Sequence, residues 1–326
     1  MSAPAGAAEG TEPRLGGLLG AGLLSAALVS AGLVLPALAP LSLVSPLPLT
    51  VQRLRSGSGG AALATLLAAA LVAALIAPGP AMLFLLVLAG PGLVIGEAMA
   101  RGRGLRRGCA WAFALLVVEV AVALAFASGA MAERFLVPLE QLRSEPFLEQ
   151  LRAGGLPPER VSAWSDQVSV LHRALAVVFP AVYVIGAALV VLADAALLRL
   201  YLQRKDPGWL EDGEFERARW PFGLVAAFVA SGALVAMPPA RPVAYNALLV
   251  LAFFFALQGL AVVGFYARRL AGPPLLRAAV LVLVLANPWA PQILALLGLF
   301  DNWFDFRRWA EPPREQGSGT RPGSGA

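Results

Sequence analysis

Apolar runs long enough to cross a lipid bilayer recur along the chain, and they constrain its fold more than any other feature. The first extends from Leu15 to Leu35, and later ones include 109–129 and 243–266. About 20 apolar residues in a helix span a hydrocarbon layer roughly 30 Å thick. Because lipid cannot hydrogen-bond to the backbone, such runs must form helices. The sequence therefore predicts an all-α fold, a polytopic transmembrane helix bundle in contact with the lipid bilayer.

Composition supports this class and excludes others. Hydrophobic residues make up 59% of the 326 residues and charged residues 14%, against roughly 25% charged in a soluble domain. The net charge of +5 comes from basic residues in short connections, which orient helices rather than bind nucleic acid. Cys109 is the only cysteine and His172 the only histidine, so one chain can build neither a disulfide nor a Cys/His metal cage. No cofactor is predicted.

The apolar pattern predicts about eight spans within one domain. Residues 1–13 and 310–326 are small and polar and are predicted to be disordered tails, with a single transmembrane domain over 14–309. Kinks are expected at Gly90-Pro91-Gly92 and near Asn287-Pro288. The predicted spans are 15–35, 61–77, 82–99, 109–129, 168–198, 222–237, 243–266 and 275–300.

A proline-rich stretch follows the first span. Pro36, Pro40, Pro46 and Pro48 interrupt an apolar sequence, and prolines at this density cannot continue a regular helix. Irregular backbone at membrane depth must be shielded by protein or water. We therefore expect 36–50 to be a packed segment that re-enters the membrane, or else crosses it.

Two longer connections carry most of the remaining polar residues. The loop 131–167, expected on the outer side, places apolar residues at helical spacing among Glu and Arg. This pattern suits an amphipathic helix on the membrane or on the end of the bundle, and a solvated linker fits equally well. The loop 199–219 is expected on the cytoplasmic side. The apolar residues of the outer loop are Phe135, Leu139, Leu142, Phe147 and Leu151.

Basic residues predict how the helices are oriented. Alternate connections, which include Arg53, Arg103, Lys205 and Arg269, hold fourteen Lys and Arg residues, whereas the opposite connections hold five. Cytoplasmic connections are enriched in these residues. We therefore expect the richer connections to face the cytoplasm. With eight spans both termini would face outward, and if 36–50 crosses fully the N-terminus lies inside.

No familiar catalytic motif occurs in the chain. The sequence lacks a Walker A loop, a GxSxG elbow, an HExxH pair and zinc-ligand spacing. We therefore predict that the protein is not an enzyme. Without a phosphate-binding loop, active transport would need an ion gradient or a partner with ATPase subunits.

Three acids lie within predicted spans, and one of them, Glu97, is near the end of its span. Glu119 is near the middle of the fourth span, where a carboxylate costs roughly 2.5–3.5 kcal/mol on insertion scales. Its side chain should point into the bundle, either as a ligand or proton site or as a hydrogen-bonded structural group. Asp194 precedes Arg199 by five residues and is expected to form an interfacial ion pair or to reach the membrane surface. Glu97, beside the arginines after the third span, is expected to be solvated.

Neutral amides complete the candidate site. Gln258 and Asn246 lie on the seventh span, and such groups bind either a polar substrate or a neighbouring helix. Our leading hypothesis places Glu119, Gln258 and Asn246 around a small polar ligand. Contact between helices is the other role open to each amide, as it is for Asn287 and Gln292.

Small residues on the first span could allow a second helix to approach closely. The spacings Ala27-xxx-Ala31 and Gly22-xxx-Ala26 both bring small side chains to one face of a helix. The arginines at 101, 103, 106 and 107 are expected to act as a positive-inside stop, although contact with anionic headgroups is also open.

Three motifs carry a resemblance to a known family. They are Ser45-Pro46-Leu47-Pro48, Gln258-Gly259-Leu260-Ala261, and the ending Gly298-Leu299-Phe300-Asp301-Asn302-Trp303-Phe304-Asp305-Phe306-Arg307. In these motifs the chain resembles the YybS-like family of uncharacterised bacterial membrane proteins. That family is distantly similar to the substrate-binding S components of energy-coupling-factor transporters.

The resemblance implies a function and a location. S components are bundles of about six helices that bind a vitamin or metal outside the cell, and their first helix meets a membrane-embedded energising module through an Ala-xxx-Ala pattern. Ala27 and Ala31 match that pattern by position. The implied function is a substrate-binding or transport subunit of the bacterial inner membrane. The alternative is a membrane scaffold or assembly factor whose buried polar groups only hold helices together.

Overall fold

The computed structural model describes residues 15–210, 219–269 and 287–310, and it contains helices and no strand within those residues. The chain divides into two compact units, Met1–Asp212 and Gly213–Ala326. We call them unit 1 and unit 2. The predicted tails lie almost wholly outside the described residues. A single membrane domain over 14–309 stays a prediction.

Helices long and apolar enough to cross a membrane confirm the predicted fold class. The described residues contain six such stretches by length and composition, together with the shorter apolar helix Phe222–Leu234. The expected last span cannot be compared in full, because 270–286 lies outside the described residues. The six stretches are Leu15–Val34, Pro36–Leu75, Pro78–Ala100, Gly104–Ala153, Pro158–Lys205 and Pro238–Arg269.

The proline-rich stretch of unit 1 is helical and crosses alongside the first helix. Helix α1 (Leu15–Val34) is followed by the 3₁₀ helix η1 (Pro36–Val44) and by α2 (Pro46–Leu75). Ser45 is hydrogen-bonded to Ser25 in the middle of α1, and Gln52 lies against Gly17 near its start. The segment therefore runs back along α1. A re-entrant or a crossing segment was expected over 36–50, and the structure shows a helical segment that continues past residue 50 to Gly57.

Local chemistry explains how these prolines fit into helices. Pro46 and Pro48 occupy the first turn of α2, where backbone N–H groups have no helical partner to lose. At the junction, Ser25 Oγ donates to the carbonyl of Ser45 at 2.7 Å and Ser45 Oγ donates to the carbonyl of Ser42 at 2.7 Å. Gly57, with a φ of 78°, then turns α2 back on itself. The residues before Gly57 run antiparallel to α1, and the residues after Gly57 run back in the direction of α1.

A π-helical turn lies where the sequence predicts a kink. The third crossing consists of α3 (Pro78–Leu83), the π-helix η2 (Phe84–Ala89) and α4 (Gly90–Ala100). The amide of Gly90 donates to the carbonyl of Leu85, five residues earlier. Pro91 cannot donate to the helix, and such a wider turn accommodates the missing bond.

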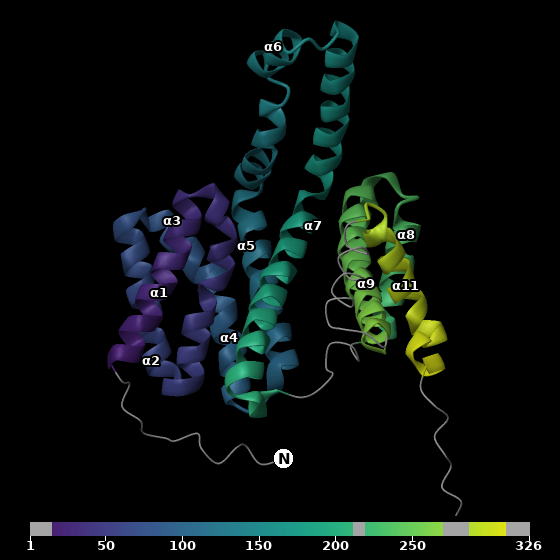
Figure 1. Ribbon diagram of the computed structural model, residues 1–326. Coiled ribbons are helices and arrows are strands. Elements are labelled where there is room, and N and C mark those ends of the chain that lie inside the picture. Colours follow the sequence, from purple (N-terminus) through teal and green to yellow (C-terminus); the bar gives the residue numbers. More distant parts are fainter. Residues whose placement is uncertain (1–14, 211–218, 270–286, 311–326) are drawn as a thin grey trace, which may run out of the picture. The chain divides into compact units, whose positions relative to one another are not determined.

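The loop expected over 131–167 is largely helical. Helix α5 (Gly104–Gln141) and helix α7 (Pro158–Lys205) extend past the other helices of unit 1, and α6 (Glu145–Ala153) joins them at the tip (Figure 1). A non-helical residue, Ala127, interrupts α5 before the extension. An amphipathic helix and a solvated linker were both open for 131–167, and the structure shows helix over most of this range.

The apolar residues of this extension hold it together as a hairpin. The Phe135 ring packs on Tyr183 at 6.0 Å, and the Phe147 ring packs on Trp164 at 6.4 Å. The indole Nε1 of Trp164 donates to the carbonyl of Leu142 at 3.2 Å. The predicted apolar face thus packs within the hairpin.

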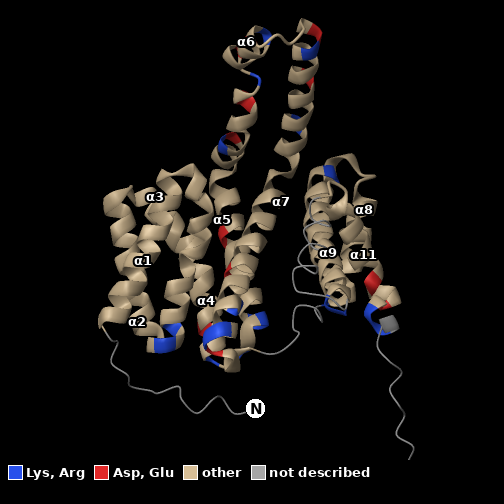
Figure 2. Cartoon of the chain, in the orientation of Figure 1, with Lys and Arg blue, Asp and Glu red and all other residues tan. Residues whose placement is uncertain are grey.

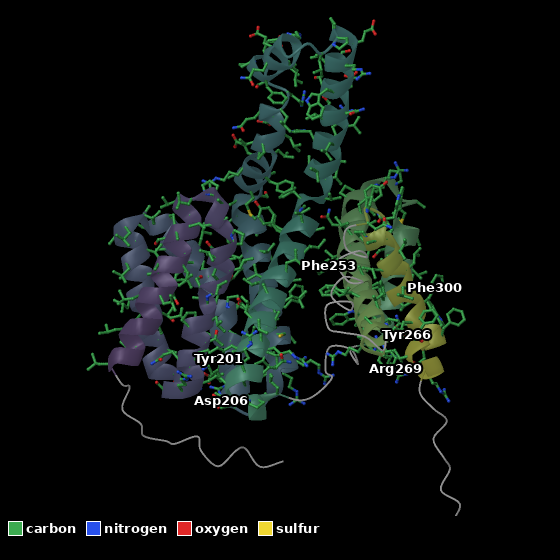
Figure 3. The ribbon with its side chains drawn as sticks, in the orientation of Figure 1. Tyr201, Asp206, Phe253, Tyr266, Arg269 and Phe300 are labelled. Carbon is green, nitrogen blue, oxygen red and sulfur yellow. The ribbon has the colours of Figure 1, made fainter. Side chains whose placement is uncertain are left out.

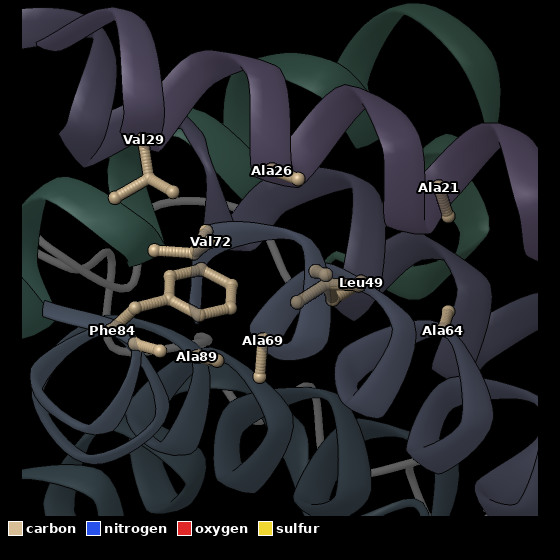
Figure 4. Close-up of a cluster of buried hydrophobic side chains, with 11 residues drawn as sticks. Ala21, Ala26, Val29, Leu49, Ala64, Ala69, Val72, Phe84 and Ala89 are labelled. Atoms are coloured by element: carbon tan, nitrogen blue, oxygen red, sulfur yellow. The ribbon is translucent and has the colours of Figure 1, made fainter. Parts of the chain in front are cut away.

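The core of unit 1 joins α1, α2 and the third crossing. Small side chains allow these helices to approach closely, and Phe84 fills the space between them (Figure 4). A Cβ at Gly22 would lie only 2.9 Å from the carbonyl oxygen of Ala64. The Gly22-xxx-Ala26 spacing is therefore used inside unit 1, where both residues are buried.

Basic side chains gather at one end of unit 1 (Figure 2). Arg53 and Arg101 pair with Glu97 at 2.5 and 2.7 Å, and Arg55 donates to the hydroxyl of Tyr201 at 2.6 Å, near the lower end of α7 (Figure 3). Glu97 is thus paired, and the expectation of a merely solvated group was wrong. Helix α1 begins at this same end, as the alternative topology with a crossing proline-rich stretch expected.

Unit 2 is built on a close pair of helices. It contains α8 (Phe222–Leu234), η4 (Pro238–Ala240), α9 (Arg241–Arg269), α11 (Ala290–Phe304) and η5 (Phe306–Ala310). A Cβ at Gly298 would collide with the carbonyl oxygen of Phe255, and one at Gly259 would collide with that of Leu294. Glycines therefore bring the backbones of α9 and α11 into contact. Helix α11 begins just after Asn287-Pro288, where a break was expected.

Candidate functional site

Asp194 is the most unusual polar group in unit 1. It lies on α7, its residue is 7% exposed, and its buried Oδ2 atom has no hydrogen-bond partner. Among the described residues no salt bridge reaches it. A buried charge without a partner is costly, so such a carboxyl must bind a proton, a cation or a hydrogen-bond donor. The described residues show no ion pair between Asp194 and Arg199, and the buried side chain does not reach the surface, so both expected roles were wrong.

Three helices meet beside this carboxyl. A Cβ built on Gly92 of α4 would lie 2.8 Å from Thr50 Oγ1, 2.9 Å from Pro46 Cβ and 3.7 Å from Asp194 Oδ2. Only glycine leaves room at this junction. The absence of a side chain at residue 92 therefore brings the start of α2 close to the carboxyl of α7.

The start of α2 lies inside unit 1, because the crossing is divided at Ser45 between η1 and α2. A helix N-terminus carries a partial positive charge. Pro46 and Pro48 in this first turn have no backbone N–H to donate. Broken crossings of this kind form ligand and ion sites in transporters. The junction of Pro46, Thr50, Gly92 and Asp194, which we call the Asp194 site, combines such a break with an unpaired acid.

Glu119 is a second acid within unit 1. Its residue on α5 is half-buried, and its Oε2 atom is buried without a hydrogen-bond partner. That this carboxyl turns away from lipid stays a prediction. The described residues offer no hydrogen bond that would make it structural glue.

Gln258 and Asn246 lie in unit 2, apart from the acids of unit 1 along the chain. Both are on α9, twelve residues apart, which corresponds to about 18 Å along a helix. Asn246 Nδ2 donates to the carbonyl of Pro242 in its own helix at 2.7 Å. The described contacts therefore do not bring Glu119, Gln258 and Asn246 together around one ligand. Their shared role stays a prediction.

Gln258 belongs to a polar cluster around Asp301, which we call the Asp301 cluster. The residue of Asp301 is 0% exposed. Its Oδ2 accepts from Gln258 Nε2 at 3.0 Å and lies 3.3 Å from Arg307 Nη2, while its Oδ1 accepts from the amide of Phe306 at 3.2 Å. Gln258 Oε1 in turn accepts from the amide of Trp220 at 3.1 Å.

Two more charged residues extend the Asp301 cluster. Arg219 lies 3.8 Å from the Asp301 carboxylate and pairs with Asp305. Asp305 itself adopts the left-handed conformation that ends α11, with a φ of 46°. Burial lowers the pKa of Arg307, and the charge of Asp301 opposes that change. Every polar atom of the Asp301 and Gln258 side chains has a protein partner, and these bonds join α9 to the end of α11 and to the residues before α8.

Sequence reasoning named part of this cluster and missed the rest. Gln258 was proposed as a ligand group, whereas Asp301, Arg219 and Arg307 were not proposed for any site. The signal was nevertheless present, because Gln258-Gly259 and the ending from Gly298 to Arg307 were both singled out as motifs. In the structure these two motifs pack against each other.

The alanines predicted to face a partner helix are on an accessible part of α1. Ala27 is exposed and Ala31 is half-buried, whereas Gly22 and Ala26 are buried against the rest of unit 1. Of the two small-residue spacings, only Ala27-xxx-Ala31 therefore remains open to another helix. Within the described residues, no group of three or more His, Cys, Asp and Glu side chains could hold a metal ion.

These features define the chain as a polytopic, all-α integral membrane protein with unpaired acids in one unit and a bonded acidic cluster in the other. The sequence model of the family described as "Predicted membrane protein (DUF2232)" matches residues 23–302. The chain belongs to this family. No curated protein and no solved structure matches it.

Proposed function

We propose that the protein is a substrate-binding or transport subunit, and that unit 1 binds a small polar ligand carrying positive charge or an exchangeable proton. The supporting observation is the buried Oδ2 atom of Asp194, which has no partner in the protein. Acids inside membrane bundles commonly mark proton or substrate pathways. Because Asp194 and Glu119 would both be anionic when ionised, they favour a cation or a proton over an anionic ligand.

The S-component analogy belongs to the same proposal. Five of the six membrane-length stretches lie in unit 1, and one of them, Pro36–Leu75, doubles back at Gly57. The exposed Ala27 leaves α1 open to a helix of an energising module with ATPase subunits. We place this assembly in the bacterial inner membrane with the basic end of unit 1 toward the cytoplasm, as the positive-inside rule expects.

Native mass spectrometry of the full chain, extracted from its own membrane, tests the proposal. A retained small molecule should appear as an added mass on the wild-type protein. Asp194→Asn keeps the size of the side chain but removes its charge, so this added mass should fall at least about tenfold in occupancy, as expected for losing a charged hydrogen bond. Glu119→Gln is the parallel variant for the second acid.

The controls decide between binding and general damage. Asn302→Ala removes an amide that bonds to the carbonyls of Gly298 and Leu299 in its own helix, and it should leave the added mass unchanged. A wild-type protein that carries no small molecule, yet keeps a stable protein partner, would contradict the transport proposal.

The alternative function, a membrane scaffold or assembly factor, is favoured by unit 2. The Asp301 cluster uses its charged and amide groups to join α9, α11 and the residues before α8. Polar groups bonded to one another in this way hold helices together without any ligand. Retention of a partner protein that survives Asp194→Asn and is lost in Asp301→Asn would support this alternative.

A further inference from the structure

The contact between α2 and α4 continues from the Asp194 site toward the basic end of unit 1. One helical turn after Gly92, a Cβ at Gly96 would lie 3.2 Å from Thr50 Cγ2 and 3.3 Å from Arg53 Cγ. Gly92 and Gly96 thus present no side chains to α2. We call this smooth strip of contact, bordered by Thr50 and Arg53, the glycine seam.

An ion pair closes the glycine seam at its basic end. Glu97 follows Gly96 directly, and its carboxylate accepts from Arg53 Nε at 2.5 Å across the seam. The Arg53 side chain is 15% exposed and the Glu97 side chain 29%. Partly solvated pairs of this kind contribute little to stability, so the pair can open without unfolding the unit.

The half of α2 that carries Thr50 and Arg53 has a break at each end. It begins at Pro46, directly after the 3₁₀ helix, and it ends at Gly57, whose φ of 78° only glycine adopts readily. A Cβ at Gly57 would meet nothing within 4 Å. Segments bounded by such residues can rotate as rigid bodies in conformational changes.

We propose that the half-helix 46–56 is a gate, and that the Arg53–Glu97 ion pair holds it closed between the Asp194 site and the basic end of unit 1. When the pair opens, the half-helix moves about Gly57 along the glycine seam and exposes Thr50 and Asp194 to that end. The ligand or proton bound at Asp194 exchanges through this opening. The gate rests on the proposed function of the Asp194 site and adds its regulation.

Thiol accessibility in the full chain, solubilised in detergent, tests the gate without any ligand. Thr50→Cys in a Cys109→Ala background places one thiol in the seam, and a small cationic methanethiosulfonate is the probe. Glu97→Gln removes the charge that holds Arg53, so modification of residue 50 should become about fivefold faster, the change expected from loss of a partly exposed ion pair. Asp194→Cys serves as a second reporter if Thr50→Cys does not fold.

A matched control comes from another ion pair of unit 1. Glu145→Gln removes the 2.5 Å pair with Arg152 in α6, away from the half-helix and the seam, and it should leave the rate unchanged. Ser25→Cys, buried on α1, should stay slow in every variant. An unchanged rate in Glu97→Gln, or an equal increase in Glu145→Gln, would overturn the gate. Either result would leave the ligand measurement on Asp194→Asn intact.

Discussion

Units 1 and 2 each bury an aspartate, and the two carboxylates differ in their hydrogen bonding. Asp301 in unit 2 has partners for both carboxylate oxygens, from Gln258, Arg307 and the backbone. Asp194 in unit 1 has an equally buried Oδ2 with no partner. A buried charge stabilises a fold only when its hydrogen bonds are complete. Unit 2 therefore uses its acid for structure, whereas the acid of unit 1 is available for another role.

The most direct test of this difference is to neutralise each aspartate in turn. Asp301→Asn should lower the free energy of unfolding by about 3–5 kcal/mol, because Arg307 would lose its charged partner in a buried position. Asp194→Asn should change it by less than about 1 kcal/mol, or raise it, because no partner is lost. Tryptophan fluorescence during unfolding in a graded detergent mixture measures both. Equal losses in the two variants would remove the distinction.

The second prediction concerns the packing that holds the Asp301 cluster in place. Gly298→Ala would force a methyl group against the carbonyl of Phe255, and such overpacking costs about 1–3 kcal/mol. Gly264→Ala, on the face of α9 where a Cβ meets nothing within 4 Å, should be neutral or slightly stabilising. The same unfolding measurement compares the two. A tolerated Gly298→Ala would show that α9 and α11 are not in backbone contact.

The smallest effect is expected on the exposed face of α1. Ala27→Leu combined with Ala31→Leu should change the stability of the chain by less than about 0.5 kcal/mol, since Ala27 is exposed and Ala31 only half-buried. If α1 docks on an energising module, the same pair should abolish recovery of that partner by blocking close approach. Gly22→Leu is the contrasting variant, because its side chain would collide with the backbone of Ala64 inside unit 1 and should destabilise the chain. Unchanged partner recovery would remove the S-component analogy.

Much of the helical content follows from local sequence. The long apolar runs predicted the fold class, the count of Lys and Arg placed the connections at 53–55 and 101–107 on one side, and Gly90-Pro91-Gly92 predicted a distortion of the third crossing. The errors fell where local pattern is ambiguous. Prolines at 46 and 48 were read as irregular structure, although they occupy a first helical turn. For the polar residues after Gly129 the sequence left both an amphipathic helix and a solvated linker open, and the structure shows that they continue a helix that packs on α7.

The candidate site depended much more on tertiary structure. Glu119 and Gln258 could be selected from the sequence because polar groups stand out in apolar runs. The sequence did not show that they belong to different units. Asp194 was assigned to Arg199 because sequence distance was the only guide to a partner. Asp301 was quoted in a motif without a role, because its partner Gln258 lies 43 residues away.

By itself, the sequence determined that this chain is a helical membrane protein, because apolar length and the lack of water in the bilayer leave helices as the solution for such runs. Only the tertiary structure decided which buried acid is bonded and which is open. The bonds that matter join residues far apart in the chain, such as Arg53 and Glu97, 44 residues apart. Whether such residues meet depends on helix register and on glycine contacts, and neither can be read from one segment alone.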